Sequence, residues 1–243
     1  MLIEQAAYRN RWRQVAPEAK ACFALAGLVA AFAAGSPGAA AAVAGLLALT
    51  TCLGAGVPGL LYLRVALPAV GFLALSCLTL LVAVDGDFTW RWAPDAAPRI
   101  AALAGRSLAA LAALLGLVLT TPLPDLIGLL RRLRCPELLL DLMVICYRML
   151  FVFSLALHDT LVAQQARLGY ATARHSLRSL GLLTANLAVQ IWQRAHALHQ
   201  AALARNGDGP LRFLTPTFAH VGRDTALAAL GGALLIALAR LGG

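Results

Sequence analysis

The chain of 243 residues is strongly apolar, with 60% hydrophobic and 13% charged residues and a mean hydropathy of +0.78. Soluble globular domains average about 25% charged residues, so the composition excludes that class and indicates a membrane protein. The net charge is +9, and all of the 20 basic residues except Lys20 are arginines. Basic cytoplasmic segments of an integral membrane protein explain it better than a nucleic-acid-binding module does.

Five apolar runs are predicted to cross the membrane as helices, because each approaches the roughly 20 residues that a spanning helix needs. They are 19–34, 39–55, 60–84, 100–120 and 224–240. The Gly-Ser-Pro-Gly segment 35–38 predicts a tight turn between the first two spans. The segment 85–99 carries acids, prolines and two tryptophans, which suit an outer interfacial loop.

The arginines predict which side each segment faces. With the N-terminus in the cytoplasm, most basic residues lie inside, as the positive-inside rule requires. The exceptions in the chain are Arg91, Arg99, Arg106 and Arg240. Arg106, near the start of the fourth span, is expected to extend outward to the membrane surface.

Small residues recur at every fourth position of the first and fourth spans, which lets helices approach one another closely. They are Gly27, Ala31 and Gly35 in the first span, and Ala101, Gly105, Ala109 and Ala113 in the fourth. We expect them to pack the bundle internally; a face that docks another membrane subunit is the alternative.

The chain is therefore predicted to be an all-α, polytopic membrane protein in three parts. Spans one to four occupy 1–120, a cytoplasmic region of long amphipathic helices occupies 121–223, and the final span occupies 224–243.

The run 137–158 is apolar enough to span, but five polar or charged residues interrupt it or end it. A sixth span there would also place the arginines of 160–223 outside. We predict a long helix lying partly in the membrane surface and partly under partner subunits.

A second amphipathic helix is predicted at 177–205, after a turn region at 169–181. Its apolar stripe at helical spacing consists of Leu180, Leu183, Leu187 and Ile191.

Motifs for catalysis are missing from the sequence. It contains no phosphate-binding GxxxxGK[ST] loop, no HExxH and no nucleophile elbow. His196 and His199 share a helix face, but no carboxylate or cysteine joins them nearby, and no cysteines form a CxxC pair. We therefore predict no catalytic residue, no cofactor and no metal site.

Two Ala-Arg motifs are the strongest functional signal. They are Ala166-Arg167-Leu168-Gly169 and Ala204-Arg205-Asn206-Gly207, each near the C-terminal end of an amphipathic helix. A following Gly or Asn supplies a left-handed capping residue, the alanine keeps the helix end narrow, and arginine pairs bidentately with carboxylates. One such arginine would be explained by the helix dipole alone. Two copies favour a docking function.

These residues resemble the transmembrane T component of energy-coupling factor (ECF) transporters, and most closely its cobalt-type CbiQ family. The resemblance is specific over about 120–210. It rests on Cys135-Pro136-Glu137, Tyr147-Arg148, AQQARLGY at 163–170 and AALARNGDG at 201–209. The last segment departs from the family pattern at Ala202, Asn206 and Gly207, where the family has Met, Gly and an aromatic residue.

The resemblance implies a non-catalytic subunit of the prokaryotic cell (inner) membrane. Such a subunit joins two ABC-type ATPase subunits, or a homodimer of one, to a small integral-membrane substrate-capture subunit. The Ala-Arg motifs would dock into the ATPases, one motif per subunit. Tyr147, Arg148 and the stripe of the second helix would pack against partners, and the substrate would be cobalt, then nickel, then a vitamin.

Two alternatives follow from the residues alone. One is the permease of a conventional ABC importer, with 200–216 as its single coupling loop. The other is an ATPase-independent scaffold or channel, in which the arginines only set the topology.

Overall fold

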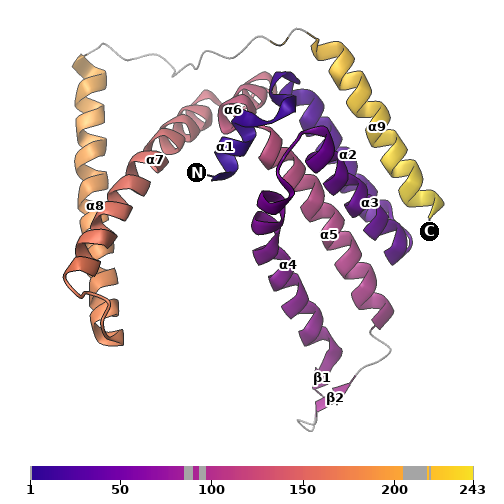
Figure 1. Cartoon of the computed structure of the whole chain (residues 1–243). Helices are drawn as coiled ribbons and strands as arrows, with labels where there is room; N and C mark the ends of the chain where they lie inside the picture. The colour runs from indigo at the N-terminus through magenta and orange to yellow at the C-terminus, as the bar shows by residue number, and fades with distance from the viewer. Residues whose placement is uncertain (1, 85–89, 93–96, 205–217, 219, 243) are drawn as a thin grey trace. The chain divides into compact units, whose positions relative to one another are not determined.

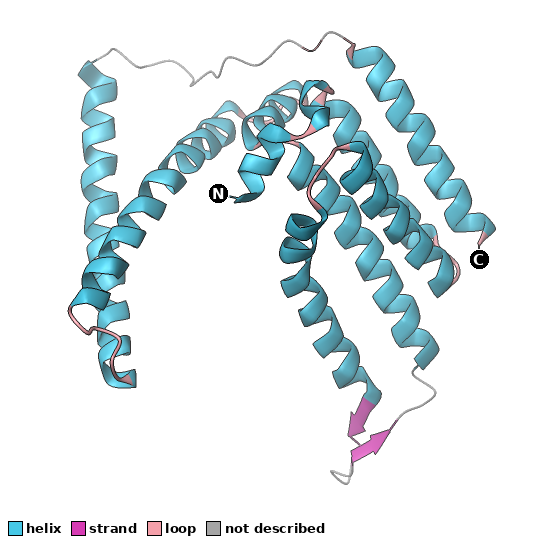
Figure 2. Ribbon diagram, in the orientation of Figure 1, coloured by secondary structure: helices cyan, strands magenta, loops and turns pink. Residues whose placement is uncertain are grey.

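The computed structural model describes residues 2–84, 90–92, 97–204, 218 and 220–242. This part of the chain is almost entirely helical (Figures 1 and 2), which confirms the predicted all-α class. The elements are α1 (Leu2–Arg9), η1 (Arg11–Gln14), α2 (Pro17–Ala33), α3 (Pro37–Leu49), η2 (Thr50–Gly54), α4 (Gly59–Leu81), β1 (Val82–Val84), β2 (Trp90–Trp92), α5 (Ala97–Thr120), α6 (Leu123–Arg132), α7 (Glu137–Ala166), α8 (Ala173–Ala204) and α9 (Val221–Leu241).

The chain forms two compact units. The first unit consists of Met1–Leu129 together with Thr215–Gly243, and the second of Leu130–Leu214. Each is described separately below.

Prolines and a capping serine set the helix boundaries of the first unit. Pro17 and Pro37 stand at the first positions of α2 and α3, where their missing N–H costs no hydrogen bond. The Ser36 hydroxyl accepts a hydrogen bond from the Ala39 N–H (3.1 Å), so the predicted tight turn is confirmed.

A short antiparallel hairpin lies between α4 and α5. Strands β1 and β2 pair Val82 with Trp92 and Val84 with Trp90 (Figure 2). The sequence prediction, which continued the third span to residue 84 and placed a loop after it, missed these strands.

Small residues form the core of the first unit, because they let α2, α3, α5 and α9 approach closely. The buried cluster consists of Ala30, Ala31, Ala34, Ala39, Ala40, Val43, Leu47, Ala109, Ala112, Ala113, Leu235 and Ala239. A Cβ added at Gly105 would lie 3.0 Å from the Ala40 Cβ and 3.1 Å from the Pro37 carbonyl oxygen. Internal packing is thus confirmed for the buried members of the predicted small-residue rows, whereas Gly35 and Ala101 are exposed near the helix ends.

Helix α9 runs parallel to α2 in this bundle. A Cβ at Gly231 would lie 3.3 Å from the Phe23 ring, and one at Gly232 would overlap the Ala26 Cβ. At the far end, the Ser36 hydroxyl donates a hydrogen bond to the Gly242 carbonyl. The two helices therefore lie side by side and point in the same direction (Figure 1).

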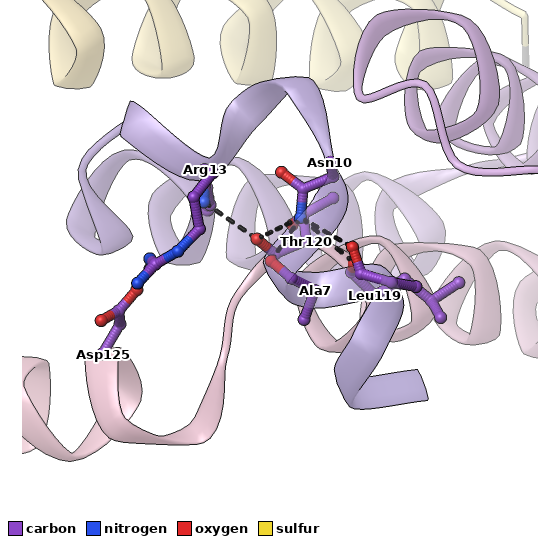
Figure 3. Close-up of polar contacts among 8 residues, drawn as sticks. Ala7, Asn10, Arg13, Leu119, Thr120 and Asp125 are labelled. Atoms are coloured by element: carbon purple, nitrogen blue, oxygen red, sulfur yellow. Dashed lines mark hydrogen bonds and ion pairs between the residues drawn. The ribbon is translucent and has the colours of Figure 1, made fainter. Parts of the chain in front are cut away.

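The N-terminal segment covers the end of α5 (Figure 3). The last carbonyls of a helix have no partner within the helix. Here the Thr120 carbonyl accepts hydrogen bonds from Asn10 Nδ2 (3.0 Å) and Lys20 Nζ (2.9 Å). Arg13 forms an ion pair with Asp125, which is buried. These contacts fix the turn at which the chain leaves the bundle.

The Arg13 guanidinium also lies 5.1 Å above the Tyr8 ring. Burial raises the pKa of the Tyr8 hydroxyl, the Glu4 and Asp125 carboxylates add to the rise, and Arg13 opposes it. Arg13 and Lys20 are among the basic residues from which the sequence predicted only the membrane topology.

Five helical segments of the described residues are long and apolar enough to cross a membrane. They are Pro37–Gly54, Gly59–Leu81, Ala97–Thr120, Glu137–Ala166 and Val221–Leu241. The number of candidate spans equals the five predicted from the sequence, but the two sets differ. Helix α7 is a candidate span here, whereas α2, the first predicted span, is not. With 17 residues, α2 extends about 25 Å and stands at the lower limit for a span.

The parallel direction of α2 and α9 bears on whether α7 crosses the membrane. Lys20 near the start of α2 contacts the end of α5, so the chain leaves the bundle at the end where α2 begins. Because α9 is parallel to α2, it begins at that same end. The segment between α5 and α9 must then cross the membrane an even number of times. Among the described helices, α8 lacks the apolarity of a span, which favours the predicted surface location of α7.

Candidate functional site at the end of helix α7

A tight hydrogen-bonded turn ends helix α7 at the first Ala-Arg motif. The Gly169 N–H donates to the Gln164 carbonyl (2.9 Å) and the Leu168 N–H donates to the Gln165 carbonyl (3.0 Å). Leu168 has a φ of 55°, in the left-handed region. These features define a Schellman motif, in which the left-handed position is usually occupied by glycine.

The prediction that Gly169 is the left-handed residue is therefore wrong, because Leu168 takes that conformation. Gly169 is required for a different reason. A Cβ at this position would lie 2.7 Å from the Ser179 hydroxyl oxygen and 2.9 Å from the Gln164 carbonyl oxygen. Only glycine lets the chain pass this closely beside α8.

Three side-chain hydrogen bonds tie together the end of α7, the turn that follows it and the start of α8. The Ser179 hydroxyl donates to the Gly169 carbonyl (2.8 Å), and Gln164 Nε2 donates to the Ser179 carbonyl (3.1 Å). The Tyr170 hydroxyl donates to Gln164 Oε1 (2.6 Å). The two helix ends are thus held as one body by contacts between their own residues.

Helix α8 begins earlier than predicted. The Thr172 hydroxyl accepts a hydrogen bond from the His175 N–H (3.2 Å), the geometry of an N-cap residue. The predicted turn region 169–181 is accordingly helical from Ala173 onward. The sequence signal for this earlier start was the threonine that precedes it.

Substituting Gly169 with alanine should destabilise the turn by about 1–3 kcal/mol, the usual cost of overpacking. Gly181 is the matched control, since it is an exposed glycine within α8 with no atom within 4 Å of an added Cβ. Gly181→Ala should stabilise the helix by up to about 1 kcal/mol. Thermal unfolding of the full chain in detergent measures both. Equal midpoints for the two variants would contradict the assigned role of Gly169.

The motif residues themselves face outward. Ala166, Arg167 and Leu168 are consecutive exposed residues at the helix end. Within the described part of the chain, Arg167 has no ion-pair partner. Its guanidinium is therefore available to a carboxylate on another protein.

The second motif is only partly described. Ala204 is the last residue of the 32-residue helix α8 and is exposed. Arg205 and Gly207 lie outside the described residues. His196 and His199 are exposed, and His196 Nε2 lies 3.1 Å from Gln200 Nε2. In the described ranges, no three His, Cys, Asp or Glu residues gather in a metal-binding arrangement.

The predicted partner-packing residues differ in burial. Tyr147 is half-buried and makes an edge-to-face contact with Phe151 (centroids 5.2 Å apart), whereas Arg148 is exposed. Along α8, Leu183 is buried and Leu187 half-buried, while Leu180 and Ile191 are 47% and 46% exposed. The chain itself therefore leaves much of this stripe uncovered.

Both helices of the second unit expose further large apolar side chains. They include Leu138, Leu142, Leu150, Leu155, Leu177, Leu182, Val189, Trp192 and Leu203. An exposed apolar surface of this kind marks contact with lipid or with another protein.

The helical bundle and its apolar spans define a multi-pass membrane protein. The model of the family described as "Cobalt transport protein", CbiQ, matches residues 9–215. The chain belongs to the CbiQ family of cobalt transport proteins, as its sequence motifs predicted.

Individual relatives agree with this assignment. The chain is 36% identical to the cobalt transport protein CbiQ of Rhodobacter capsulatus over 219 residues, covering 88% of this chain and 87% of that protein. It is 37% identical to CbiQ of Salmonella typhimurium over 89 residues, covering 37% and 40% of the two chains. A putative fused cobalt transport protein CbiMQ of Methanocorpusculum labreanum is 35% identical over 136 residues, covering 55% of this chain and 22% of that protein.

Proposed function

We propose that this chain is the energy-coupling T subunit of an ECF-type importer for cobalt ions in the prokaryotic cell (inner) membrane. It joins two ABC-type ATPase subunits, or a homodimer of one, to a small substrate-capture subunit of the membrane. The ATPases hydrolyse ATP, and this chain transmits their motion without catalytic residues or a cofactor of its own.

The exposed Arg167 is the observation that carries this proposal. It stands at the end of a 30-residue helix, on a backbone fixed by the Schellman hydrogen bonds. A rigid arginine at a narrow helix end suits insertion into a partner's groove, where it would bind a carboxylate bidentately. The second motif follows the same pattern in the sequence, because Ala204, the last residue of α8, directly precedes Arg205.

The exposed apolar residues of α7 and α8 support a membrane partner. A second membrane subunit that covered these side chains would remove their apolar surface from water or lipid. The name of the fused CbiMQ relative indicates that, in that protein, another cobalt transport part shares the polypeptide.

Movement would pass from the ATPases to the capture subunit through the turn between α7 and α8. A displacement of Arg167 moves Gln164 and Gly169, whose hydrogen bonds to Ser179 carry the displacement into α8. Because both helices present apolar side chains, their joint movement would tilt a subunit that packs on them.

Uptake of radiolabelled cobalt tests the proposal. Cells that express the ATPase, capture and coupling subunits together should accumulate cobalt, and cells lacking only this chain should fall to background. Excess unlabelled nickel would report whether the substrate preference is for cobalt. Undiminished uptake without this chain, or uptake supported by this chain alone, would refute the coupling role.

A further inference from the structure

Leu168, which directly follows Arg167, combines an unusual backbone conformation with an exposed side chain. Its backbone has a left-handed φ of 55°, and its side chain is 74% exposed. Bulky L-residues rarely adopt this conformation, because their Cβ approaches the following carbonyl oxygen. Glycine or asparagine would satisfy the same turn with less strain.

The fold of this chain makes little use of the Leu168 side chain. In Schellman motifs, a hydrophobic contact often forms between the residue after the left-handed position and one in the last helical turn. Here those residues are Gly169 and Gln164, so no such apolar contact exists. A strained residue that the fold does not need is grounds for seeking a function.

Arg134 provides an internal comparison, because it occupies the same position at the end of α6. It has a φ of 61°, and the hydrogen bonds from Arg134 to Arg131 and from Cys135 to Leu130 repeat the motif. A positive charge at a helix C-terminus interacts favourably with the helix dipole. Leu168 has no charge, so that interaction cannot explain its presence.

We propose that Leu168 is a second anchor of the same docking site. It would enter an apolar recess in the ATPase subunit, beside the carboxylate that receives Arg167. The inference rests on the proposed function. Ala166, Arg167 and Leu168 are exposed in succession at one helix end, so Leu168 directly adjoins the arginine that the proposal places in the ATPase groove. Burying leucine there stabilises the complex by removing apolar surface from water.

The sequence of the second motif makes the two docking sites unequal. Asn206 stands where Leu168 stands in the first motif. The first site therefore combines an ionic with an apolar contact, while the second has a polar residue beside its arginine. Apolar contacts are not screened by salt, so the first site should withstand high ionic strength better.

The test uses the full chain, purified in detergent with co-expressed ABC-type ATPase subunits, and measures the affinity of the ATPase at low and high salt. Leu168→Asn relieves the backbone and copies the second motif; Leu168→Met keeps an apolar side chain. We expect Leu168→Asn to weaken binding about tenfold, more markedly at high salt, without lowering the thermal midpoint of the free chain. Leu168→Met should bind within about threefold of the unmodified chain. Arg134→Asn, which relieves the same backbone elsewhere, should leave binding unchanged.

Arg167→Ala separates this inference from the proposed function. If Arg167→Ala loses the ATPase while Leu168→Asn retains it, Leu168 is no anchor and the coupling role stands. If Arg167→Ala and Leu168→Asn both retain it fully, both proposals fail. Equal losses in Leu168→Met and Leu168→Asn, or a loss in Arg134→Asn, would show that an apolar anchor is not the cause.

Discussion

Replacing Arg167 and Arg205 together with alanine should detach the ATPase subunits from this chain and abolish cobalt uptake. Each arginine is expected to bind a carboxylate in a partner groove, and a charge-assisted hydrogen bond contributes about 1.5–3 kcal/mol. Because about 1.4 kcal/mol corresponds to a tenfold change in affinity, each single substitution should weaken binding about 10- to 100-fold. In the proposed complex both motifs bind one ATPase pair, so their effects are expected to multiply in the double variant.

Co-purification of the ATPase subunits with the full chain, over a dilution series, measures this loss. Arg174→Ala combined with Arg178→Ala is the matched control, because it removes the same charge from exposed positions on α8. This control should keep the ATPase. A conventional permease with one coupling loop would lose binding only through Arg205, and an ATPase-independent scaffold would show no effect of either arginine.

A cysteine placed at position 174 should react with a membrane-impermeant maleimide only from the cytoplasmic side. The parallel packing of α9 on α2 returns the chain to the end of the bundle that it left after α5. If α7 lies in the membrane surface, the start of α8 stays on that side. The expected result is all or none: labelling in inside-out vesicles and no labelling in intact cells.

The labelling experiment requires a cysteine-free background, because Cys22 and Cys146 are exposed. A cysteine at position 38, in the first turn of α3, is the opposite control and should label from outside. Cobalt uptake would verify that the background variant is folded. Labelling of position 174 from outside would show that α7 crosses the membrane.

The helices of the bundle were predictable because their causes are local. Apolar runs of sufficient length, the Gly-Ser-Pro-Gly turn and the small-residue rows each act within a few residues, and the structure has helices at all five predicted spans. The family could also be recognised, since its motifs are short and contiguous. Predicting these features did not depend on knowing which helices contact one another.

Other features depend on contacts that are distant in sequence. Nothing local marks Asn10 and Lys20 as donors to the Thr120 carbonyl, because the partners are 110 and 100 residues apart. The assignment of Gly169 failed for a related reason. A glycine after a helix usually indicates a left-handed residue, but here the approach of Ser179 on the next helix explains the glycine.

The division of the first unit into two separated segments affects how the protein is made. A ribosome completes α2, α3 and α5 before the whole of the second unit, and only then synthesises α9. Until that moment the α2 surface around Ala26, which α9 packs against, has no partner from its own chain. Translation that stops within residues 130–214 therefore yields an incomplete bundle as well as an incomplete second unit. A complete first unit thus reports that the second unit has been fully translated.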